Sequence, residues 1–328
     1  MDGPIEIGSV RRVSITILVD NKADLIVESN ERVKYYTDEP LLAEHGFSAL
    51  IQLDGAEKKI LWDAGVSRVA LMGNLRRMKL DVASIGTMAL SHGHLDHYAA
   101  MTDLLMEMAP LSREEEWAAT PDGDQVEEWM AALRIPIVAH PAAFRERWWR
   151  EDDGTLVGPL SPAPAQAWQA LGAEIVLSEG PHRLAPGCWT TGYVPRNSFE
   201  NAGRGKKRLF RQGSQLLPDD LEDDQAIVIH LEGKGLVVLA GCAHSGIVNT
   251  IVHARRISGV EKVHAVIGGF HLATASEEDI ARTVEEMQAL GPHLVVPCHC
   301  TGLKAICRFA QGMPEQFVEG VVGATYLL

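Results

Sequence analysis

Residues 91–97 read Ser-His-Gly-His-Leu-Asp-His, after an apolar run at residues 87–90 that predicts a β-strand and before a helical pattern at residues 99–108. Four of the seven residues have side chains that bind metal ions: His92, His94, Asp96 and His97. Imidazoles two residues apart on an extended turn can converge on one ion, whereas Asp96 and His97, at the helix entry, point toward a second. A solvated histidine-rich loop is the alternative, but the density of ligand-type residues favours a metal site that begins at this turn.

Other short apolar runs, many of them rich in β-branched residues, predict further strands and alternate with helical patterns. These runs lie at residues 13–19, 48–53, 59–62, 136–139, 174–177, 226–231, 236–240, 263–267 and 294–296. A capping box at residues 276–279 precedes Ile280, Val284 and Met287 at helical spacing, so a helix is expected between the last two strands. Strands that end in glycine-bearing loops, with helices between them, predict an α/β fold. We expect a four-layer αβ/βα sandwich, with two sheets face to face and helices outside.

Composition narrows the possible functions and partners. The 328 residues are 46% hydrophobic and 23% charged, which is enough material for a large core. A formal net charge of −14 disfavours nucleic acid and anionic membrane surfaces as partners. No apolar run approaches the ~20 residues of a membrane helix, and the first ten residues lack the pattern of a signal peptide. We therefore expect a cytoplasmic protein.

Cysteine usage fits a reducing compartment. The five cysteines are too few and too unevenly spaced for a disulfide scaffold in a chain of this length: Cys188, Cys242, Cys298, Cys300 and Cys307. Their thiols are then available to bind metal ions.

Two segments interrupt the alternation of strands and helices. Residues 109–125 are polar and contain proline, and residues 201–224 change from a basic to an acidic run. Long segments of this kind are typical of active-site lids or disordered loops. We expect one domain over residues 1–328, with loop or lid insertions near residues 109–135 and 197–224.

The sequence of residues 91–97 resembles the signature of the metallo-β-lactamase superfamily, and residues 61–65 (Leu-Trp-Asp-Ala-Gly) resemble its strand-ending aspartate and glycine. The resemblance extends over nearly the whole chain. It implies that Asp63 lies behind the metal site and accepts hydrogen bonds from it, in line with the need to orient ligating imidazoles. It also implies a final ligand, His299, in residues 297–302 (Pro-Cys-His-Cys-Thr-Gly). Cys298 and Cys300 on either side are expected to pack rather than bind.

The resemblance leaves one ligand to be assigned. Relatives carry an aspartate or a cysteine at the strand end that here reads Gly-Cys-Ala-His-Ser-Gly (residues 241–246), so Cys242 and His244 both qualify. The histidine usual in the preceding segment is absent from residues 190–196. We expect His244 to supply the missing ligand. Whether Cys242 is a ligand or a small buried apolar residue stays open, because free cysteines are commonly buried.

Further residues are candidates for contact with the substrate or the ligands. His271 follows the strand at residues 263–267, and a core histidine is the alternative reading. His45, His140 and Asp224 are assigned to the same group. Arg196 and the basic cluster at residues 204–211 are candidates to hold an anionic substrate, although charge runs are usually solvated.

Seven segments together resemble one branch of the superfamily, named for a dihydropterin-methyl-ribofuranosylaminobenzene-phosphate synthase: VDN (19–21), EHGFS (44–48), TGYVPR (191–196), DDQA (223–226), GCAHSG (241–246), GGFHL (268–272) and PCHCTG (297–302). The reaction of that branch is a transfer that releases pyrophosphate. Such a resemblance does not fix the substrate.

The resemblance implies an enzyme with two divalent ions, which we expect to be zinc, with manganese or iron as alternatives. Two ions lower the pKa of a bridging water toward ~7 and so provide hydroxide at neutral pH. Asp96 is expected to orient that hydroxide and shuttle its proton. We expect a dinuclear hydrolase of an ester, lactone or phosphoester, with the pyrophosphate-releasing transferase as the alternative and a catalytically inactive sensor as a third hypothesis. The expected partner is a small anionic molecule; the oligomeric state is open.

Overall fold

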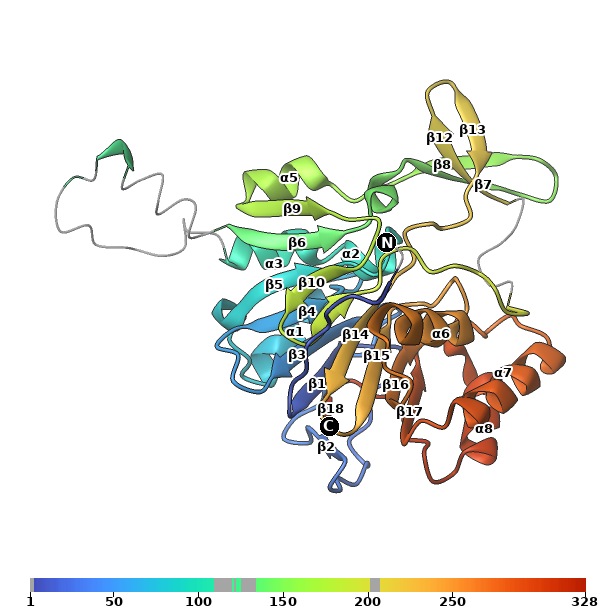
Figure 1. Cartoon of the computed structure of the whole chain (residues 1–328). Helices are drawn as coiled ribbons and strands as arrows, with labels where there is room; N and C mark the ends of the chain where they lie inside the picture. The colour runs from blue at the N-terminus through green and yellow to red at the C-terminus, as the bar shows by residue number, and fades with distance from the viewer. Residues whose placement is uncertain (1–2, 109–119, 121, 125–133, 201–206) are drawn as a thin grey trace.

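The computed structural model describes residues 3–108, 120, 122–124, 134–200 and 207–328. Figure 1 shows a sandwich of two sheets with helices on both outer sides. The first sheet has the strand order β2-β18-β1-β3-β4-β5-β6-β9. Its strands are β1 (Val13–Val19), β2 (Val33–Tyr35), β3 (Ser48–Leu53), β4 (Lys59–Trp62), β5 (Ile85–Ala89), β6 (Ile135–Ala139), β9 (Ala173–Leu177) and β18 (Ala324–Leu327).

The second sheet has the order β10-β11-β14-β15-β16-β17. Its strands are β10 (His182–Ala185), β11 (Cys188–Thr190), β14 (Ala226–Leu231), β15 (Gly235–Ala240), β16 (Val263–Gly269) and β17 (Leu294–Cys298). The outer helices are α1 (Arg68–Arg77), α3 (Met101–Met108) and α5 (Ala165–Ala170) on the first sheet, and α6 (Ile247–Ser258), α7 (Glu277–Leu290) and α8 (Leu303–Gly312) on the second.

Three apolar layers hold the sandwich together. Between the sheets, Ile51 and Trp62 of the first sheet belong to the same buried cluster as Leu239 of the second. The helices add a layer on each outer face, as with Trp168 of α5 and Phe309 of α8, both fully buried. Burying an aliphatic or aromatic side chain of this size contributes about 1.5–3 kcal/mol. The predicted four-layer sandwich is confirmed.

Strands β14 and β15 show why the apolar runs predict the central elements so well. β15 is buried along its whole length, because one face packs on the first sheet and the other on α6. A strand buried on both faces reads as a continuous apolar run. The helix expected between the last two strands is α7, where the Ser276 side chain accepts a hydrogen bond from the Asp279 amide and Gly291 ends the helix in a left-handed conformation.

Parallel pairing explains why functional residues gather at one place. β4, β5, β6 and β9 run parallel in the first sheet, and β15, β16 and β17 run parallel in the second. The carboxyl ends of parallel neighbours lie at the same sheet edge, where loops carry functional groups. The loops after β4, β5, β15, β16 and β17 contain Asp63, residues 91–97, Cys242, His271 and His299.

A third sheet corrects the expectation of a long loop or lid near residues 197–224. Residues 208–218 form a hairpin of β12 (Arg208–Gln212) and β13 (Gln215–Pro218), which pairs with β7 (Arg147–Arg150) and β8 (Leu156–Leu160). This sheet projects from the sandwich in Figure 1. Charged residues obscured the hairpin in the sequence, where Leu209 is its buried anchor. Residues 109–119, 121, 125–133 and 201–206 of the expected insertions lie outside the described residues, among them Arg204 and Lys206.

Candidate metal centre

The turn after β5 places two histidine rings against each other. His94 has an extended backbone and begins the short helix α2 (Leu95–Tyr98). His92 Nε2 lies 2.9 Å from His94 Nδ1. Gly93 between them has no room for a side chain, because an added Cβ would lie 2.0 Å from the Ala143 carbonyl oxygen. The spacing of the histidines therefore depends on a glycine at this position.

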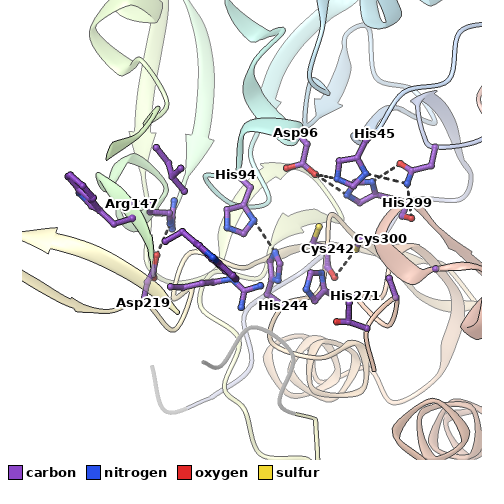
Figure 2. A pocket seen from close by; sticks show the side chains of 18 of the residues that line it. His45, His94, Asp96, Arg147, Asp219, Cys242, His244, His271, His299 and Cys300 are labelled. Atoms are coloured by element: carbon purple, nitrogen blue, oxygen red, sulfur yellow. Dashed lines mark hydrogen bonds and ion pairs between the residues drawn. The ribbon is translucent and has the colours of Figure 1, made fainter. Parts of the chain in front are cut away.

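His244 completes a set of three nitrogens. Its Nε2 lies 3.1 Å from His92 Nε2 and 3.2 Å from His94 Nδ1, and Figure 2 shows the side chains of His94 and His244 next to each other. Burial lowers the pKa of all three rings below the usual value, for His94 to about 3. They are therefore neutral, which is the form of histidine that binds metal ions. We call His92, His94 and His244 the first donor set.

A second donor set lies beside the first. Asp96 Oδ2 is 3.5 Å from His97 Nε2 and 3.4 Å from His299 Nε2. Burial works to raise the pKa of Asp96, but His97 and His299 lower it below the usual value, so the carboxylate is anionic. His299 Nε2 is buried and, apart from this contact with Asp96, has no polar partner among the described residues. A buried ring nitrogen beside an anionic oxygen and a second imidazole fits a divalent ion with mixed N and O ligands.

Cys242 lies between the two sets. Its Sγ is 3.2 Å from His97 Nε2. Its sulfur and the ligand atoms of His92 and His244 all lie within 4.8 Å of one another, and the same holds for its sulfur with His97 and His299. The thiol is therefore positioned to touch ions in either set.

Asp63 orients the second set from behind, as the resemblance implies. Its Oδ2 is 2.7 Å from His97 Nδ1, and its Oδ1 accepts a hydrogen bond from the Ser91 amide. Burial works to lower the pKa of His97, whereas Asp96 and Asp63 raise it to about 9. Asp63 is fully buried, so it acts on the centre through His97 and Ser91, which it holds in place, rather than by facing the cavity.

Two residues that the sequence interpretation did not assign hold His299. Asp20 Oδ1 accepts a hydrogen bond from the His299 amide at 2.8 Å, and Asn21 Oδ1 lies 3.2 Å from His299 Nδ1. Burial raises the pKa of Asp20 to about 6. The available signal was their position, directly after the first strand. Asp224 holds the loop that carries His244 in a similar way, because it accepts hydrogen bonds from the amides of His244 and Ser245.

Backbone strain also concentrates at the centre. Non-glycine residues with left-handed backbone angles include one after each of four strands that end at the centre: Asp63, Ala243, His271 and His299. Such conformations cost of order 1–3 kcal/mol each and persist where surrounding structure enforces them, typically at functional sites.

A cavity of about 620 Å³ opens onto the two donor sets. Its far wall comes from the third sheet and includes Trp148, Trp149 and Arg208. Of the proposed basic cluster, Arg208 thus reaches the cavity. His45 and His271 also line it: His45 Nε2 is 3.2 Å from Asp96 Oδ2, and the rings of His271 and His244 lie 4.1 Å apart.

Arg147, another residue without a sequence motif, ties the third sheet to the metal-binding turn. Its buried guanidinium donates to Asp219 Oδ2 and Asp223 Oδ1, both at 2.7 Å, and to the Gly93 carbonyl at 3.1 Å. Asp223 accepts in return from the Gly93 amide. Residue 147 is far in sequence from its partners 219 and 223. No local sequence pattern therefore predicts these ion pairs.

Two candidates lie apart from the cavity lining. The His140 side chain caps a short 3-10 turn by accepting a hydrogen bond from the Ala142 amide. Arg196 donates to the Asp220 carbonyl. The structure thus brings together the ligand candidates with Asp63, His45, His271 and Asp224, but not these two.

The sequence and the fold of this chain are both similar to those of known proteins. No family model matches the chain. It is 31% identical over 300 residues to the 7,8-dihydropterin-6-methyl-4-(β-D-ribofuranosyl)-aminobenzene-5'-phosphate synthase of Methanocaldococcus jannaschii, covering 88% of this chain and 94% of the relative. The solved structure of TM1679, described as a metal-dependent hydrolase of the β-lactamase superfamily, aligns with a TM-score of 0.69 at 22% identity, covering 95% of this chain and 98% of that chain. Zinc-bound PqqB from Methylobacterium extorquens aligns with a TM-score of 0.51 at 13% identity, covering 95% and 99%.

Proposed function

Since this chain belongs to the metallo-β-lactamase superfamily and, within it, to the family of the dihydropterin-methyl-ribofuranosylaminobenzene-phosphate synthase, we propose that it is a two-metal hydrolase. One observation carries the proposal: two largely buried donor sets converge beside one thiol at the floor of a cavity. Structural cores rarely collect neutral histidines and an ionised carboxylate in this way, because buried polar groups without partners are costly.

The residues present fit two divalent ions. His92, His94 and His244 would hold one, and Asp96, His97 and His299 the other, with Cys242 between them. Zinc suits this mixture of nitrogen, oxygen and sulfur donors. When bound, two such ions supply a nucleophile by lowering the pKa of water toward ~7, and they stabilise charge on the reacting oxygens.

Asp96 and His45 perform the proton handling in this proposal. The Asp96 carboxylate is anionic and its side chain is 19% exposed, so it reaches the cavity and can orient water there. His45 Nε2 lies 3.2 Å from it, and the His45 side chain is 67% exposed. The carboxylate can therefore accept a proton from that water and pass it to His45, and from there to solvent.

The cavity supports a small anionic substrate. Its volume of about 620 Å³ falls within the range of small-molecule sites. Arg208 on the far wall supplies a positive charge in a protein whose net charge is −14, and guanidinium groups bind phosphate and carboxylate well. We propose a phosphoester, carboxylic ester or lactone that carries an anionic group.

The test is a substrate panel with zinc- or manganese-loaded protein in isotopically labelled water. The proposal expects turnover of at least one ester class, with one labelled oxygen in the product and loss of turnover in His94→Ala. Metal-loaded, folded protein that turns over none of these classes would contradict it.

Transfer with release of pyrophosphate is the second candidate, favoured by 31% identity to the synthase over most of both chains. The same donor sets would then act on a diphosphate, and Arg208 would face its charge. Pyrophosphate that appears only when both the diphosphate donor and the ring acceptor are present supports transfer. Product labelled from water in the absence of the acceptor supports hydrolysis.

A further inference from the structure

We propose a third donor set, Cys242, His271 and Cys300, which binds an additional thiophilic divalent ion of the zinc, cobalt or cadmium class on the cavity side of the centre. Two sulfurs and one imidazole nitrogen of these residues lie within 4.8 Å of one another. Figure 2 shows Cys242, His271 and Cys300 grouped beside His244.

Cys242 is available to this ion. The first set offers three nitrogens, and the second offers two nitrogens and a carboxylate oxygen, all without the thiol. The Cys242 sulfur is therefore not needed to complete three donors in either set. It can be shared with, or given to, an ion that His271 and Cys300 approach from the other side.

Contacts with neighbouring residues fix the position of the Cys300 side chain. Its Sγ faces the Cys242 carbonyl oxygen at 3.6 Å. Gly269 makes room for it, because a Cβ there would lie 2.7 Å from the Cys300 sulfur. Sequence interpretation expected Cys300 to pack. Its half-buried position on the cavity lining instead makes the sulfur accessible to an ion from solvent.

His271 provides the nitrogen. Its Nδ1 is buried and has no hydrogen-bond partner among the described residues. Its backbone is left-handed, with φ of 49°, and the hydrogen bond from the Ala273 amide to the Cys300 carbonyl ties its loop to the cysteine. A strained loop that holds an imidazole with an unpartnered ring nitrogen, in reach of two thiols, indicates a ligand role.

The donor chemistry selects the ion. Two thiols and an imidazole suit zinc, cobalt(II) or cadmium, whereas magnesium and manganese prefer oxygen ligands. Thiolates are the binding form, so two protons leave as the ion enters. The inference holds whether the enzyme hydrolyses or transfers, since it concerns binding alone.

The experiment is a cobalt(II) titration of metal-free full-length protein, followed by thiolate-to-cobalt charge-transfer absorption. The wild-type chain is expected to bind three equivalents. Cys300→Ser and His271→Ala are expected to bind two, and both should lose the charge-transfer absorption that accompanies the third equivalent. Cys307→Ser, which removes an exposed thiol on α8, is the matched control and should match the wild type.

Alkylation of the unmodified chain keeps the test independent of folding of the variants. Zinc should slow the reaction of Cys300 with iodoacetamide at least tenfold and leave Cys307 unchanged. Saturation of the wild type at two equivalents, a third equivalent retained in Cys300→Ser, or alkylation of Cys300 unaffected by zinc would overturn the proposal. A failed ester panel with three bound equivalents would overturn only the proposed function.

Discussion

At the scale of single residues, His244 lies where one side chain can stand in for a histidine that the sequence lacks in its usual place. Residues 190–196 contain no histidine, and His244 Nε2 lies within 3.2 Å of both His92 and His94. The motif at residues 91–97 was recognisable because its ligands are neighbours in sequence. Asp20, Asn21 and Arg147 could not be assigned in this way, because only the fold brings them to the centre.

His244→Ala is expected to weaken metal binding by about 100-fold or more, since loss of even an outer-shell partner costs about 10 to 100-fold. It removes one of three nitrogens of the first donor set. Competition titration with a metal chelator measures the change. His182→Ala, on β10 and away from the cavity lining, is the control. Unchanged affinity in His244→Ala would show that the first donor set is misassigned.

Asp63→Asn tests whether the Asp63 carboxylate holds His97 in the orientation that binds metal. The variant keeps the size of the side chain but loses the negative charge that lies 2.7 Å from His97 Nδ1. We expect metal affinity to fall by about 10 to 100-fold, the usual cost of removing the partner of a ligating histidine. Calorimetric titration with zinc on both proteins makes the comparison, and equal affinities would refute a role for Asp63 in orienting His97.

At the scale of elements, the apolar runs predicted the strands that deliver the ligands, because these strands are buried on both faces or carry β-branched residues. β2, β10, β11 and β18 were missed because they are short or lie toward sheet edges. β7 and β12 were missed because charged residues such as Arg147 and Arg208 lie among their apolar ones.

Arg147→Met tests whether the third sheet supports the turn that carries His92 and His94. Asp219 and Asp223 would lose a buried partner, and breaking a buried pair in this way costs about 3–5 kcal/mol. The Gly93 carbonyl would also lose its donor, so metal affinity should fall together with stability. Urea unfolding and metal titration measure the two effects. Arg211→Met, whose partner Glu146 is exposed, should leave the free energy of unfolding nearly unchanged, because solvent screens such a pair.

His264 on β16, away from the donor sets, predicts part of the pH dependence of the protein's stability. Burial, then Lys234 and His293, lower its pKa to about 4. The unfolded chain takes up this proton near pH 6.5, so the stability linked to neutral His264 is present above that pH and is lost as pH falls toward 4. His264→Gln should therefore show a flatter loss of stability between pH 6.5 and 4 in urea unfolding. Parallel pH profiles of both proteins would exclude this contribution.

At the scale of the whole molecule, the donor sets lie where the two sheets meet. His92, Asp96 and His97 follow strand β5 of the first sheet, whereas His244 and His299 follow β15 and β17 of the second. Ions bound there would link both halves of the sandwich. The layered fold was predictable from the order of strands and helices, whereas the third sheet at the cavity was not.

Removal of metal should consequently destabilise the whole domain. Ligands that bind only the folded state stabilise it by about 2.7 kcal/mol at a free concentration 100 times Kd. We expect chelator-treated protein to unfold at a lower temperature and zinc to restore the transition. In Asp96→Ala, which keeps the three histidines of the first set, restoration should be partial. A Tm that does not respond to zinc would argue against a link across the sheets. Among the residues that the structure describes, none of the helices combines the length and the apolar character of a membrane span.

The most direct test of a two-metal centre is anomalous X-ray diffraction from crystals of the zinc-loaded protein at the zinc absorption edge. A two-metal centre predicts two peaks roughly 3.5–4 Å apart. One should lie against His92, His94 and His244, and the other against Asp96, His97 and His299. A third peak beside Cys300 is compatible with this result. A zinc-loaded crystal with one peak or none among these six residues would contradict the central claim.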